Sequence, residues 1–456
     1  MGAAVSLFAR HALLPQGWRR DVLICWDAAG ELTSVTDNAA PPDGVELAEY
    51  VLPGMVNLHS HAFQRALGGM AEKAGSGPDS FWTWRELMYR FAGRITPEQI
   101  EAIAAQLFAE CLRHGYTAVC EFHYLQRDAA GSLYARPAET AERVVQAARL
   151  SGIGITMLPV LYSHAGFGAQ PLKPEQARFR TDADDVLRIV EALAAQRDGQ
   201  VEVGCAPHSL RAASIDQITA LLAALPSERP VHMHIAEQQA EVAQCLAATG
   251  RRTVQYLYDQ LDVDARWCLV HATHLAADEI ALIANSGAVA GLCPTTEANL
   301  GDGLFPLPEF IAAGGRFGIG SDSHVSQSPV EELRWLEYGQ RLQRQQRNIA
   351  ATPQQRHVGD YLWQTALQGG AQASGRKLGA LAAGCRADLL VLDDAHPNLC
   401  GVAVSDVLGS FLFCGNDNLV RDVLCGGRWQ VRNKRHLAQD AIAASYKRTL
   451  ARLRAL

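Results

Sequence analysis

Eight short apolar segments that alternate with helix-like segments constrain the fold of this chain more than any other feature of its sequence. Each has the length of a buried strand, and the residues between them have helical periodicity. The expected strands are Val51 to Leu58, Thr117 to Phe122, Ile153 to Leu161, Val201 to Ala206, Val231 to Ile235, Trp267 to Val270, Ala288 to Leu292 and Arg316 to Ile319. Eight β/α units predict a closed (β/α)8 barrel of the TIM type, an α/β fold. The alternative is a doubly wound open sheet, but no GxGxxG sequence follows a strand to favour it.

The segments between these strands favour helices, and the clearest helix runs from Thr96 to His114. Thr96 can cap it, Pro97 suits the first helical position, and Gly115 follows where a left-handed residue is expected. Five further helices are expected at Val144 to Leu150, Ala183 to Gln196, Ile215 to Leu225, Glu237 to Thr249 and Ala277 to Asn285.

The two ends of the chain have the pattern of short strands separated by turns. The expected strands are Val5 to Phe8, Asp21 to Trp26, Leu32 to Thr36 and Val45 to Ala48, then Ala387 to Leu392, Val402 to Val407, Val420 to Cys425 and Arg428 to Val431. Since chain termini often lie close together, we expect both ends to form one small β-sandwich domain. The predicted division is 1–51 and 379–437 for this domain, 52–378 for the catalytic barrel, and 438–456 for a C-terminal helix.

Composition limits the kind of protein that this chain can be. Of its 456 residues, 48% are hydrophobic and 20% are charged, as in a folded soluble enzyme. The net charge of −7 provides no basic surface for nucleic acid, and no apolar run is long enough to span a membrane. The eleven cysteines form no CxxC pair and no signal-peptide pattern is present, so we expect a cytoplasmic protein. A homodimer is expected as the commonest symmetric assembly.

Histidine and aspartate side chains stand at the ends of four predicted strands. His59 and His61 end the first strand, His234 the fifth, His271 the sixth and Asp322 the eighth. Residues i and i+2 of a strand share a face, and the carboxyl ends of barrel strands meet at one site. We therefore predict one divalent metal ion, expected to be Zn²⁺, with a position open for water. The predicted ligands are His59, His61, His234 and Asp322.

Glu237 and His271 are the candidates for proton transfer beside the metal, and Asp322 joins them as a catalytic residue. Glu237 follows His234 by three residues, at the predicted start of the next helix, close to the ion but not bound to it. A carboxylate there can act as general base and then as general acid. His271 either binds a second metal or orients the nucleophilic hydroxide. The fourth strand has no lysine to bridge two ions, which favours one metal. His232 is expected one layer deeper, in packing or hydrogen bonding.

This set of residues resembles the amidohydrolase superfamily over nearly the whole chain. The resemblance is carried by His59-Ser60-His61, His234 with Glu237, His271, Ser321-Asp322, and the segment from Gly384 to Leu389. It implies the barrel and the small β-domain described above. The HxxE element and the missing lysine are similar to the deaminases with a single divalent metal. That similarity implies attack of a metal-bound hydroxide on a carbon that carries nitrogen, with loss of ammonia.

Polar residues near the other strand ends indicate the class of substrate. Arg85, Tyr124 and Arg211 are expected at the mouth of the barrel, and arginine forks suit a small dicarboxylate. The segments from Phe63 to Leu67 and from Cys293 to Gly301 closely resemble iminohydrolases of histidine degradation within the superfamily. The resemblance implies hydrolysis of N-formimino-L-glutamate to N-formyl-L-glutamate and ammonia. It also implies that the substrate is held by Gln64, Arg85, Tyr124, His208 and Arg211.

Two other interpretations stay open at this point. The nearer one is a deaminase or chlorohydrolase of the same superfamily that acts on a nucleobase or triazine ring, in which case the arginines form ordinary surface ion pairs. The other is a barrel that has lost catalysis, although no expected catalytic residue is missing from the sequence.

Overall fold

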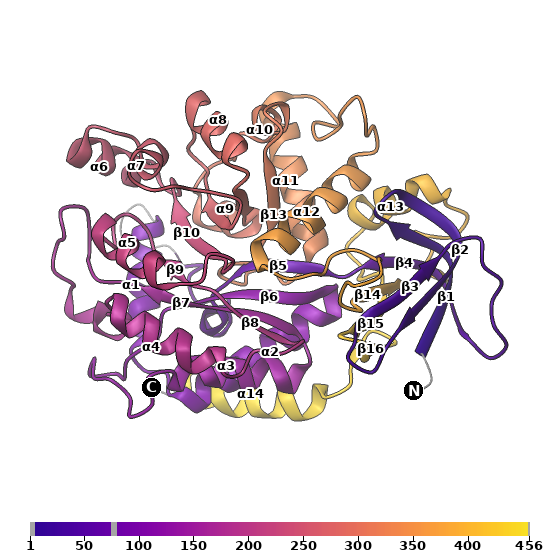
Figure 1. Ribbon diagram of the computed structural model, residues 1–456, viewed down its shortest axis with the longest axis horizontal. Helices are drawn as coiled ribbons and strands as arrows, with labels where there is room; N and C mark the ends of the chain where they lie inside the picture. The colour runs from indigo at the N-terminus through magenta and orange to yellow at the C-terminus, as the bar shows by residue number, and fades with distance from the viewer. Residues whose placement is uncertain (1–4, 74–79, 455–456) are drawn as a thin grey trace.

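The barrel lies at the centre of the computed structural model, which describes residues 5–73 and 80–454 (Figure 1). Its strands form two parallel sheets, β5 (Met55–Ser60), β6 (Tyr116–His123), β7 (Gly154–Leu161), β8 (Val201–Val203) and β9 (Ala206–Pro207), then β10 (Val231–Ile235), β11 (Trp267–His271), β12 (Val289–Leu292) and β13 (Arg316–Ile319). Parallel bridges from Ser60 to Asp322 and from Cys205 to Val231 join the sheets at both edges. The sheet therefore closes, which confirms the predicted barrel and excludes the open sheet.

Helices surround the barrel between its strands. They are α1 (Phe81–Ala92), α2 (Pro97–His114), α3 (Glu139–Ser151), α4 (Ala183–Ala194), α5 (Ile215–Ala224), α6 (Gln239–Thr249), α7 (Thr253–Gln260), α8 (Ala277–Ser286), α9 (Pro294–Leu300), α10 (Leu307–Ala312), α11 (Pro329–Arg344) and α12 (Val358–Ser374), with 3-10 helices η1 (Ala62–Leu67) and η2 (Pro174–Phe179). The capping prediction for α2 is confirmed, because the Thr96 side chain accepts a hydrogen bond from the Gln99 amide and Gly115 has a φ of +105°.

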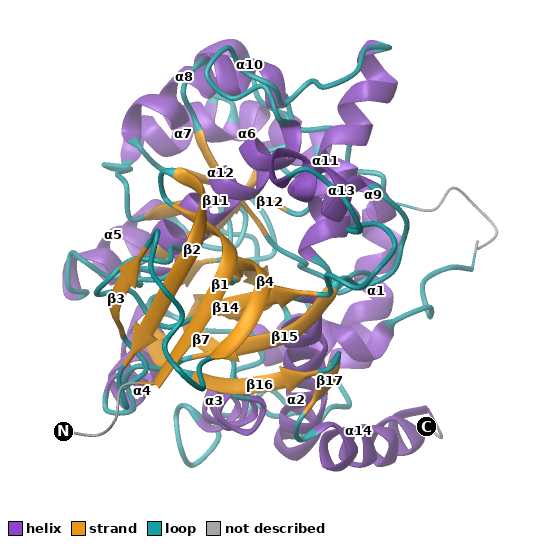
Figure 2. Ribbon diagram, turned by 90° about the vertical axis from the view of Figure 1, so that its right-hand side faces the viewer, coloured by secondary structure: helices purple, strands orange, loops and turns teal. Residues whose placement is uncertain are grey.

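The ends of the chain meet in one eight-stranded sheet (Figure 2). Its strands are β1 (Val5–Leu14), β2 (Gly17–Trp26), β3 (Leu32–Thr36), β4 (Glu46–Pro53), β14 (Leu389–Leu392), β15 (Val420–Cys425), β16 (Arg428–Arg432) and β17 (Arg435–His436). The junction between the ends is the antiparallel pair of β4 and β14. Buried side chains of β1, β2, β4, β14 and β15 form a hydrophobic cluster of their own, so this sheet has a separate core.

Three predicted strands differ from the structure, and one of them, Val201 to Ala206, is divided into β8 and β9. The run from Val51 to Leu58 is divided at Gly54, where β4 of the small sheet ends and β5 of the barrel begins. A Cβ at Gly54 would lie 2.2 Å from the Thr117 hydroxyl oxygen, so the close approach of β6 requires glycine there. The strand expected at Val402 to Val407 is wrong, because η3 (Val404–Asp406) and α13 (Val407–Phe413) occupy the segment. Its apolar face packs on α11 and α12 instead of extending a sheet.

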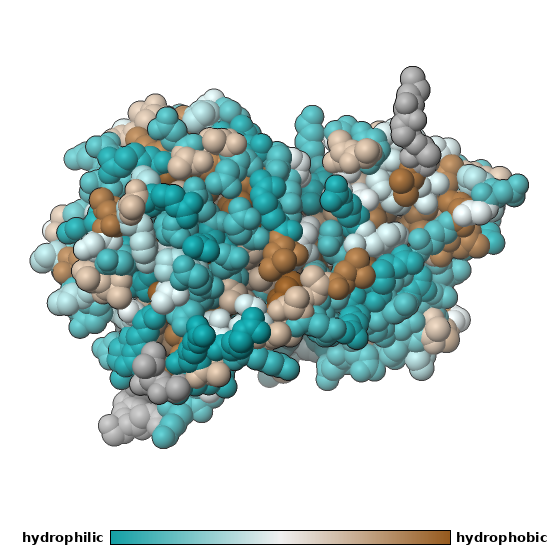
Figure 3. Space-filling view, turned by 90° about the horizontal axis from the view of Figure 1, so that it is seen from below, coloured by the Kyte–Doolittle hydropathy of each residue, from teal (hydrophilic) through white to brown (hydrophobic). Residues whose placement is uncertain are grey.

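Beyond the small sheet, α14 (Gln439–Arg454) returns to the barrel and packs on α2 (Figure 1). We propose the division 1–51, 52–378, 379–437 and 438–456 as the organisation of the chain, of which residues 1–4, 74–79 and 455–456 lie outside the described part. The face in Figure 3 is mainly hydrophilic, with separate small hydrophobic patches. None of the helices within 5–73 and 80–454 has the length and apolar character needed to cross a membrane.

Candidate active site

Three histidines converge at the carboxyl ends of the barrel strands. His59 and His61 are the residues before and after Ser60, where β5 ends, and His234 lies near the end of β10. The Nε2 atom of His59 is 3.2 Å from Nε2 of His61 and 3.0 Å from Nε2 of His234. The Oδ1 atom of Asp322 lies 3.3 Å from the His61 nitrogen and 3.5 Å from the His59 nitrogen. The four predicted ligands are therefore brought to one point.

The protonation of these rings fits a cation between them. The Nδ1 atom of His61 is 2.8 Å from the Phe122 carbonyl oxygen, and Nδ1 of His234 is 3.0 Å from the His208 carbonyl oxygen. A carbonyl oxygen accepts a hydrogen bond from an Nδ1–H group, so each neutral ring carries its proton on Nδ1 and directs an Nε2 lone pair at its neighbours. Burial lowers the pKa of His59 to about 3, and it also lowers the pKa values of His61 and His234. Neutral imidazole nitrogens and a carboxylate at this spacing suit a divalent ion such as zinc.

Asp322 could add a charged oxygen to these three nitrogens. Burial acts to raise its pKa, but the hydrogen bond to His59 and the nearby rings of His61 and His271 hold the pKa below its ordinary value. Within the described residues, two sets of three side chains are close enough together to share a metal ion. One set is His59, His61 and His234, and the other is His59, His271 and Asp322. Because both sets contain His59, they are consistent with one metal site.

His271 is held by carboxylates on both sides of its ring. Its Nδ1 atom is 3.3 Å from Oε1 of Glu297, while its Nε2 atom is 3.8 Å from Glu237 and 3.8 Å from Asp322. Burial acts to lower the pKa of His271, but these three carboxylates raise it to about 10. Glu297 therefore fixes which way the His271 ring faces.

Glu237 is almost completely enclosed beside this ring. Its carboxyl group is 5% exposed, and burial raises its pKa to about 7 in spite of the positive charges of His271 and Arg211. The expected helix start at Glu237 is wrong, because α6 begins at Gln239. Ala236 instead has a φ of +49°, which turns the chain directly after β10 and before Glu237.

The backbone is strained at two of the functional positions. His271 has a φ of +68° and Asp322 a φ of +43°, in the left-handed region that residues with a side chain seldom adopt. Beside Asp322, the Asn57 side chain holds Ser321 from two directions, with its amide nitrogen 2.6 Å from the Ser321 hydroxyl and its oxygen 2.9 Å from the Ser321 amide. This clamp ties β5 to the end of β13 and stabilises the turn that presents Asp322.

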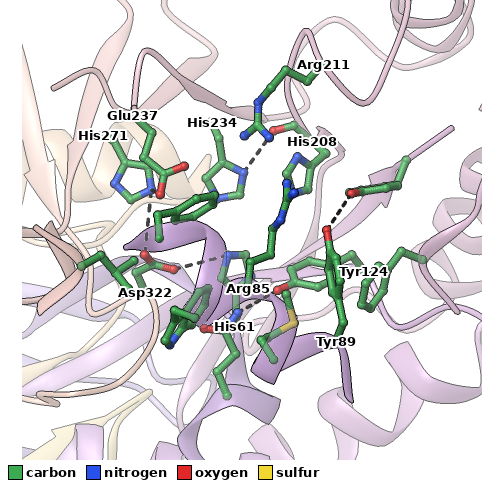
Figure 4. Close-up of a pocket in the computed structure, with 17 residues that line it drawn as sticks. His61, Arg85, Tyr89, Tyr124, His208, Arg211, His234, Glu237, His271 and Asp322 are labelled. Atoms are coloured by element: carbon green, nitrogen blue, oxygen red, sulfur yellow. Dashed lines mark hydrogen bonds and ion pairs between the residues drawn. The ribbon is translucent and has the colours of Figure 1, made fainter. Parts of the chain in front are cut away.

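A cavity of about 560 Å³ extends from these groups to the mouth of the barrel. Its walls include all five residues predicted to hold the substrate, namely Gln64, Arg85, Tyr124, His208 and Arg211. In Figure 4, Glu237, His271 and Asp322 lie on one side, and Tyr89 and Tyr124 lie on the other. The structure therefore gathers the predicted catalytic and substrate-binding residues around one space.

Neither arginine of the cavity forms an ion pair within the described part of the chain. No ion pair joins Arg85 or Arg211 to any carboxylate in residues 5–73 and 80–454, and the buried Nε atom of each has no hydrogen bond there. The Arg85 guanidinium instead lies 4.5 Å from the centre of the Trp82 ring, and that of Arg211 lies 6.0 Å from it. The ordinary surface ion pairs required by the ring-deaminase interpretation are thus missing from the described structure.

Gln64, Tyr124 and His208 supply neutral polar groups to the same wall. The Gln64 amide donates to the Tyr124 hydroxyl at 2.7 Å, while Oε1 of Gln64 is buried without a partner among the described residues. Burial and the nearby Arg211 lower the pKa of His208 well below its ordinary value, so that ring is neutral. These groups can donate and accept hydrogen bonds without adding charge.

A sequence model of the amidohydrolase family matches residues 50–430, from the last part of β4 to β16. The chain belongs to the amidohydrolase family. It is 53% identical over 449 residues to a formimidoylglutamate deiminase of Pseudomonas aeruginosa, covering 98% of this chain and 99% of the relative. A crystal structure of an amidohydrolase from Brucella melitensis has 42% identity and a TM-score of 0.93, covering 98% and 99% of the two chains.

The barrel of this amidohydrolase also matches more distant structures. An adenosine deaminase of Xanthomonas campestris with bound zinc has a TM-score of 0.81 at 21% identity, covering 99% of both chains, which shows a shared fold. Members of the family depend on metal, and the cluster of His59, His61, His234 and Asp322 could bind it in this amidohydrolase.

Sequence reasoning missed several residues that this amidohydrolase places at the cavity or beside it. Glu297 is not part of the cavity wall but contacts His271, which is. It lies within the segment from Cys293 to Gly301 that carries the resemblance, yet the contact requires Glu297 of α9 to meet the end of β11. Tyr89 and Tyr162 line the cavity but follow no motif.

His232 was expected one layer deeper than His234, in packing or hydrogen bonding. Its Nε2 atom lies 2.8 Å from the Ala373 carbonyl oxygen of α12.

Proposed function

We propose that this chain hydrolyses N-formimino-L-glutamate to N-formyl-L-glutamate and ammonia. The observation that carries the proposal is the pair of unpartnered arginines, Arg85 and Arg211, in the cavity that also contains Glu237 and the histidine cluster. The 53% identity to a formimidoylglutamate deiminase over the whole chain supports the same substrate. A dicarboxylate suits this pair, because the buried Arg211 and the partly buried Arg85 form no ion pair with the described residues, and an unpaired charge away from water is costly.

The substrate is bound by its two carboxylates. Arg85 and Arg211 each pair with one carboxylate through the guanidinium fork, and Gln64, Tyr124 and His208 complete the hydrogen bonds. Binding energy from these distant groups holds the formimino carbon against Glu237 and the histidine cluster.

Proton transfer is carried out by Glu237. One divalent ion, proposed to be Zn²⁺, would be held by His59, His61, His234 and Asp322, and it would supply Lewis acidity that makes water a better nucleophile. Glu237 accepts a proton from the attacking water and delivers it to the terminal nitrogen. The water oxygen bonds to the formimino carbon, the bond from that carbon to the terminal nitrogen breaks, and both water protons leave in ammonia. His271, fixed by Glu297, orients the reacting groups.

Ammonia release from a panel of substrates tests this proposal. N-Formimino-L-glutamate should be turned over far faster than guanine, cytosine or adenosine, with the metal content measured on the same sample. If one of the ring compounds is the better substrate, the chain is a ring deaminase and the arginines have another function.

We further propose that the enzyme acts in histidine degradation, in the cytoplasm and as a homodimer. All eleven cysteines are free, as expected in a reducing compartment. Light scattering on a size-exclusion column would measure the mass, and a monomer would contradict the proposed assembly.

A further inference from the structure

Two tyrosines at the wall of the cavity are linked to one glutamine. Tyr89 comes from α1, Tyr162 directly follows β7, and Gln176 lies in η2. The Nε2 atom of Gln176 is 2.7 Å from the Tyr162 hydroxyl and 3.3 Å from the Tyr89 hydroxyl, and the hydroxyls are 3.4 Å apart. Tyr89 and Tyr162 both line the cavity, whereas Gln176 lies behind them and is 2% exposed.

The orientation of the Gln176 amide is fixed by the main chain. Its Oε1 atom accepts a hydrogen bond from the Lys173 amide at 2.9 Å. If the amide were flipped, its NH₂ group would face the Lys173 N–H, and two donors would oppose each other. The NH₂ group therefore faces the tyrosines, and both phenolic oxygens act as acceptors toward Gln176.

Counting the protons leaves one hydroxyl without an acceptor. Each tyrosine has one phenolic proton, and the contact between the two oxygens can use only one of them. Neither hydroxyl has any other partner in the described part of the chain. Either hydroxyl could donate in the contact between the two oxygens. Gln176 binds the Tyr162 hydroxyl more closely than the Tyr89 hydroxyl, at 2.7 Å against 3.3 Å, and a hydroxyl that accepts a strong hydrogen bond is the better donor. We therefore take Tyr162 as the donor to Tyr89, which leaves the Tyr89 proton unused.

The surroundings of this proton indicate an anionic acceptor. Tyr89 is four residues after Arg85, so the two side chains share one face of α1. The Arg85 guanidinium lies 5.5 Å from the centre of the Tyr89 ring, and both side chains border the cavity in Figure 4. A carboxylate that Arg85 binds through two oxygen lone pairs has further lone pairs to accept a hydrogen bond.

We propose that Tyr89 donates its hydroxyl proton to the substrate carboxylate paired with Arg85, and that Gln176 is the positioning residue that leaves this proton free to face the cavity. This inference rests on the proposed function and deepens it, since it adds a specificity residue to the carboxylate site. The bond is made equally in the bound substrate and during the reaction, so its loss affects KM more than kcat.

Three substitutions distinguish this arrangement from general packing. Tyr89→Phe removes the donor and should raise KM for N-formimino-L-glutamate about tenfold or more, since hydrogen bonds to charged groups are strong, with kcat within about twofold. Gln176→Glu has nearly the same shape but offers an oxygen to the hydroxyls. It draws both phenolic protons away from the cavity, so KM should rise at least as much. Tyr162→Phe leaves the Tyr89 proton free, so KM should change by less than about threefold.

The control is Tyr258→Phe, which also deletes a hydroxyl bonded at 2.8 Å, in this case to Ser286 on the outer helices. It should leave both kcat and KM unchanged. The metal content and the melting temperature of all four variants should be measured, and the kinetic comparison should use variants that match the unaltered enzyme in both. Equal effects of Tyr89→Phe and Tyr162→Phe would overturn the proposal, because a packing role affects both rings alike.

The inference can fail separately from the proposed function. Where the unaltered enzyme releases ammonia from N-formimino-L-glutamate but Tyr89→Phe keeps its KM, only the role of Tyr89 is wrong. Where the unaltered enzyme releases no ammonia from that substrate, the proposed function fails and the role of Tyr89 fails with it.

Discussion

Glu237 and His271 are neighbours, and their surroundings raise the pKa values of both, which favours the neutral form of the acid and the charged form of the imidazole. Burial raises the pKa of Glu237 to about 7, which allows its carboxyl group to take up and release a proton near neutrality. For His271, burial acts to lower the pKa, but Glu237, Glu297 and Asp322 raise it to about 10. The proposed proton carrier is therefore Glu237.

Glu237→Gln tests that role, because the substitution keeps the shape of the side chain and removes the base. Turnover should fall by about 10²–10⁴-fold, the usual contribution of positioned acid–base catalysis. The metal content should stay at the level of the unaltered enzyme, since Glu237 is not among the proposed ligands. A variant that retains most of its turnover would assign the proton transfer to another group.

Arg85→Met and Arg211→Met test recognition of the two carboxylates. Each change leaves one substrate carboxylate unpaired in the cavity, so kcat/KM for N-formimino-L-glutamate should fall. The fall should correspond to a loss of about 2–4 kcal/mol in transition-state stabilisation. N-Formiminoglycine, with a single carboxylate, should be a poor substrate and should be insensitive to one of the two changes. Equal turnover of both substrates by the unaltered enzyme would disprove recognition of a dicarboxylate.

At the scale of elements, α12 lies directly on the backbone of β13. A Cβ at Gly369 would be 2.0 Å from the Phe317 carbonyl oxygen, and one at Gly370 would be 2.8 Å from the Val56 Cβ atom. Because these two positions have no side chain, the helix can approach β5 and β13 closely. His59 belongs to β5, and Asp322 follows β13.

Gly369→Ala should therefore destabilise the protein, although alanine favours a helix by about 1 kcal/mol. The clash is with backbone that cannot move aside, so we expect a net loss of about 1–3 kcal/mol in the free energy of unfolding. The matched control is Gly409→Ala in α13, where nothing lies within 4 Å and a small gain is expected. Denaturant unfolding measures both, and equal stability of the two variants would contradict this account.

At the scale of the whole molecule, the four residues of the proposed metal site come from both sheets of the barrel. His59 and His61 come from the sheet that begins with β5, whereas His234 and Asp322 belong to the sheet from β10 to β13 or follow it. An ion held by all four would connect the two halves and would offset the repulsion between facing nitrogen lone pairs.

Removal of the metal should accordingly lower the melting temperature, and one equivalent of Zn²⁺ per chain should restore it. Calorimetry before and after chelation, with the metal measured on the same samples, provides the test. Two equivalents that are both needed for activity would overturn the single-metal proposal, and an unchanged melting temperature would show that the ion does not join the sheets.

Local patterns in the sequence were enough to predict the barrel and the cluster at its mouth. Strand length, helix caps such as Thr96, and the i, i+2 spacing of His59 and His61 depend on residues close together in the chain. In a barrel, all strand ends of one polarity face the same site, so placing each strand was sufficient to bring His234 and Asp322 beside that pair.

Only the tertiary structure decided which more distant residues meet. Gly54 ends β4 because Thr117 leaves no room for a Cβ, and the apolar run after Val402 is helical because α11 and α12 cover it. The partners of His271 and Tyr89 come from α9 and η2, far along the chain. Such contacts depend on how whole helices and strands pack against each other. The spacing of residues along the sequence does not show which distant side chain will lie beside a given residue.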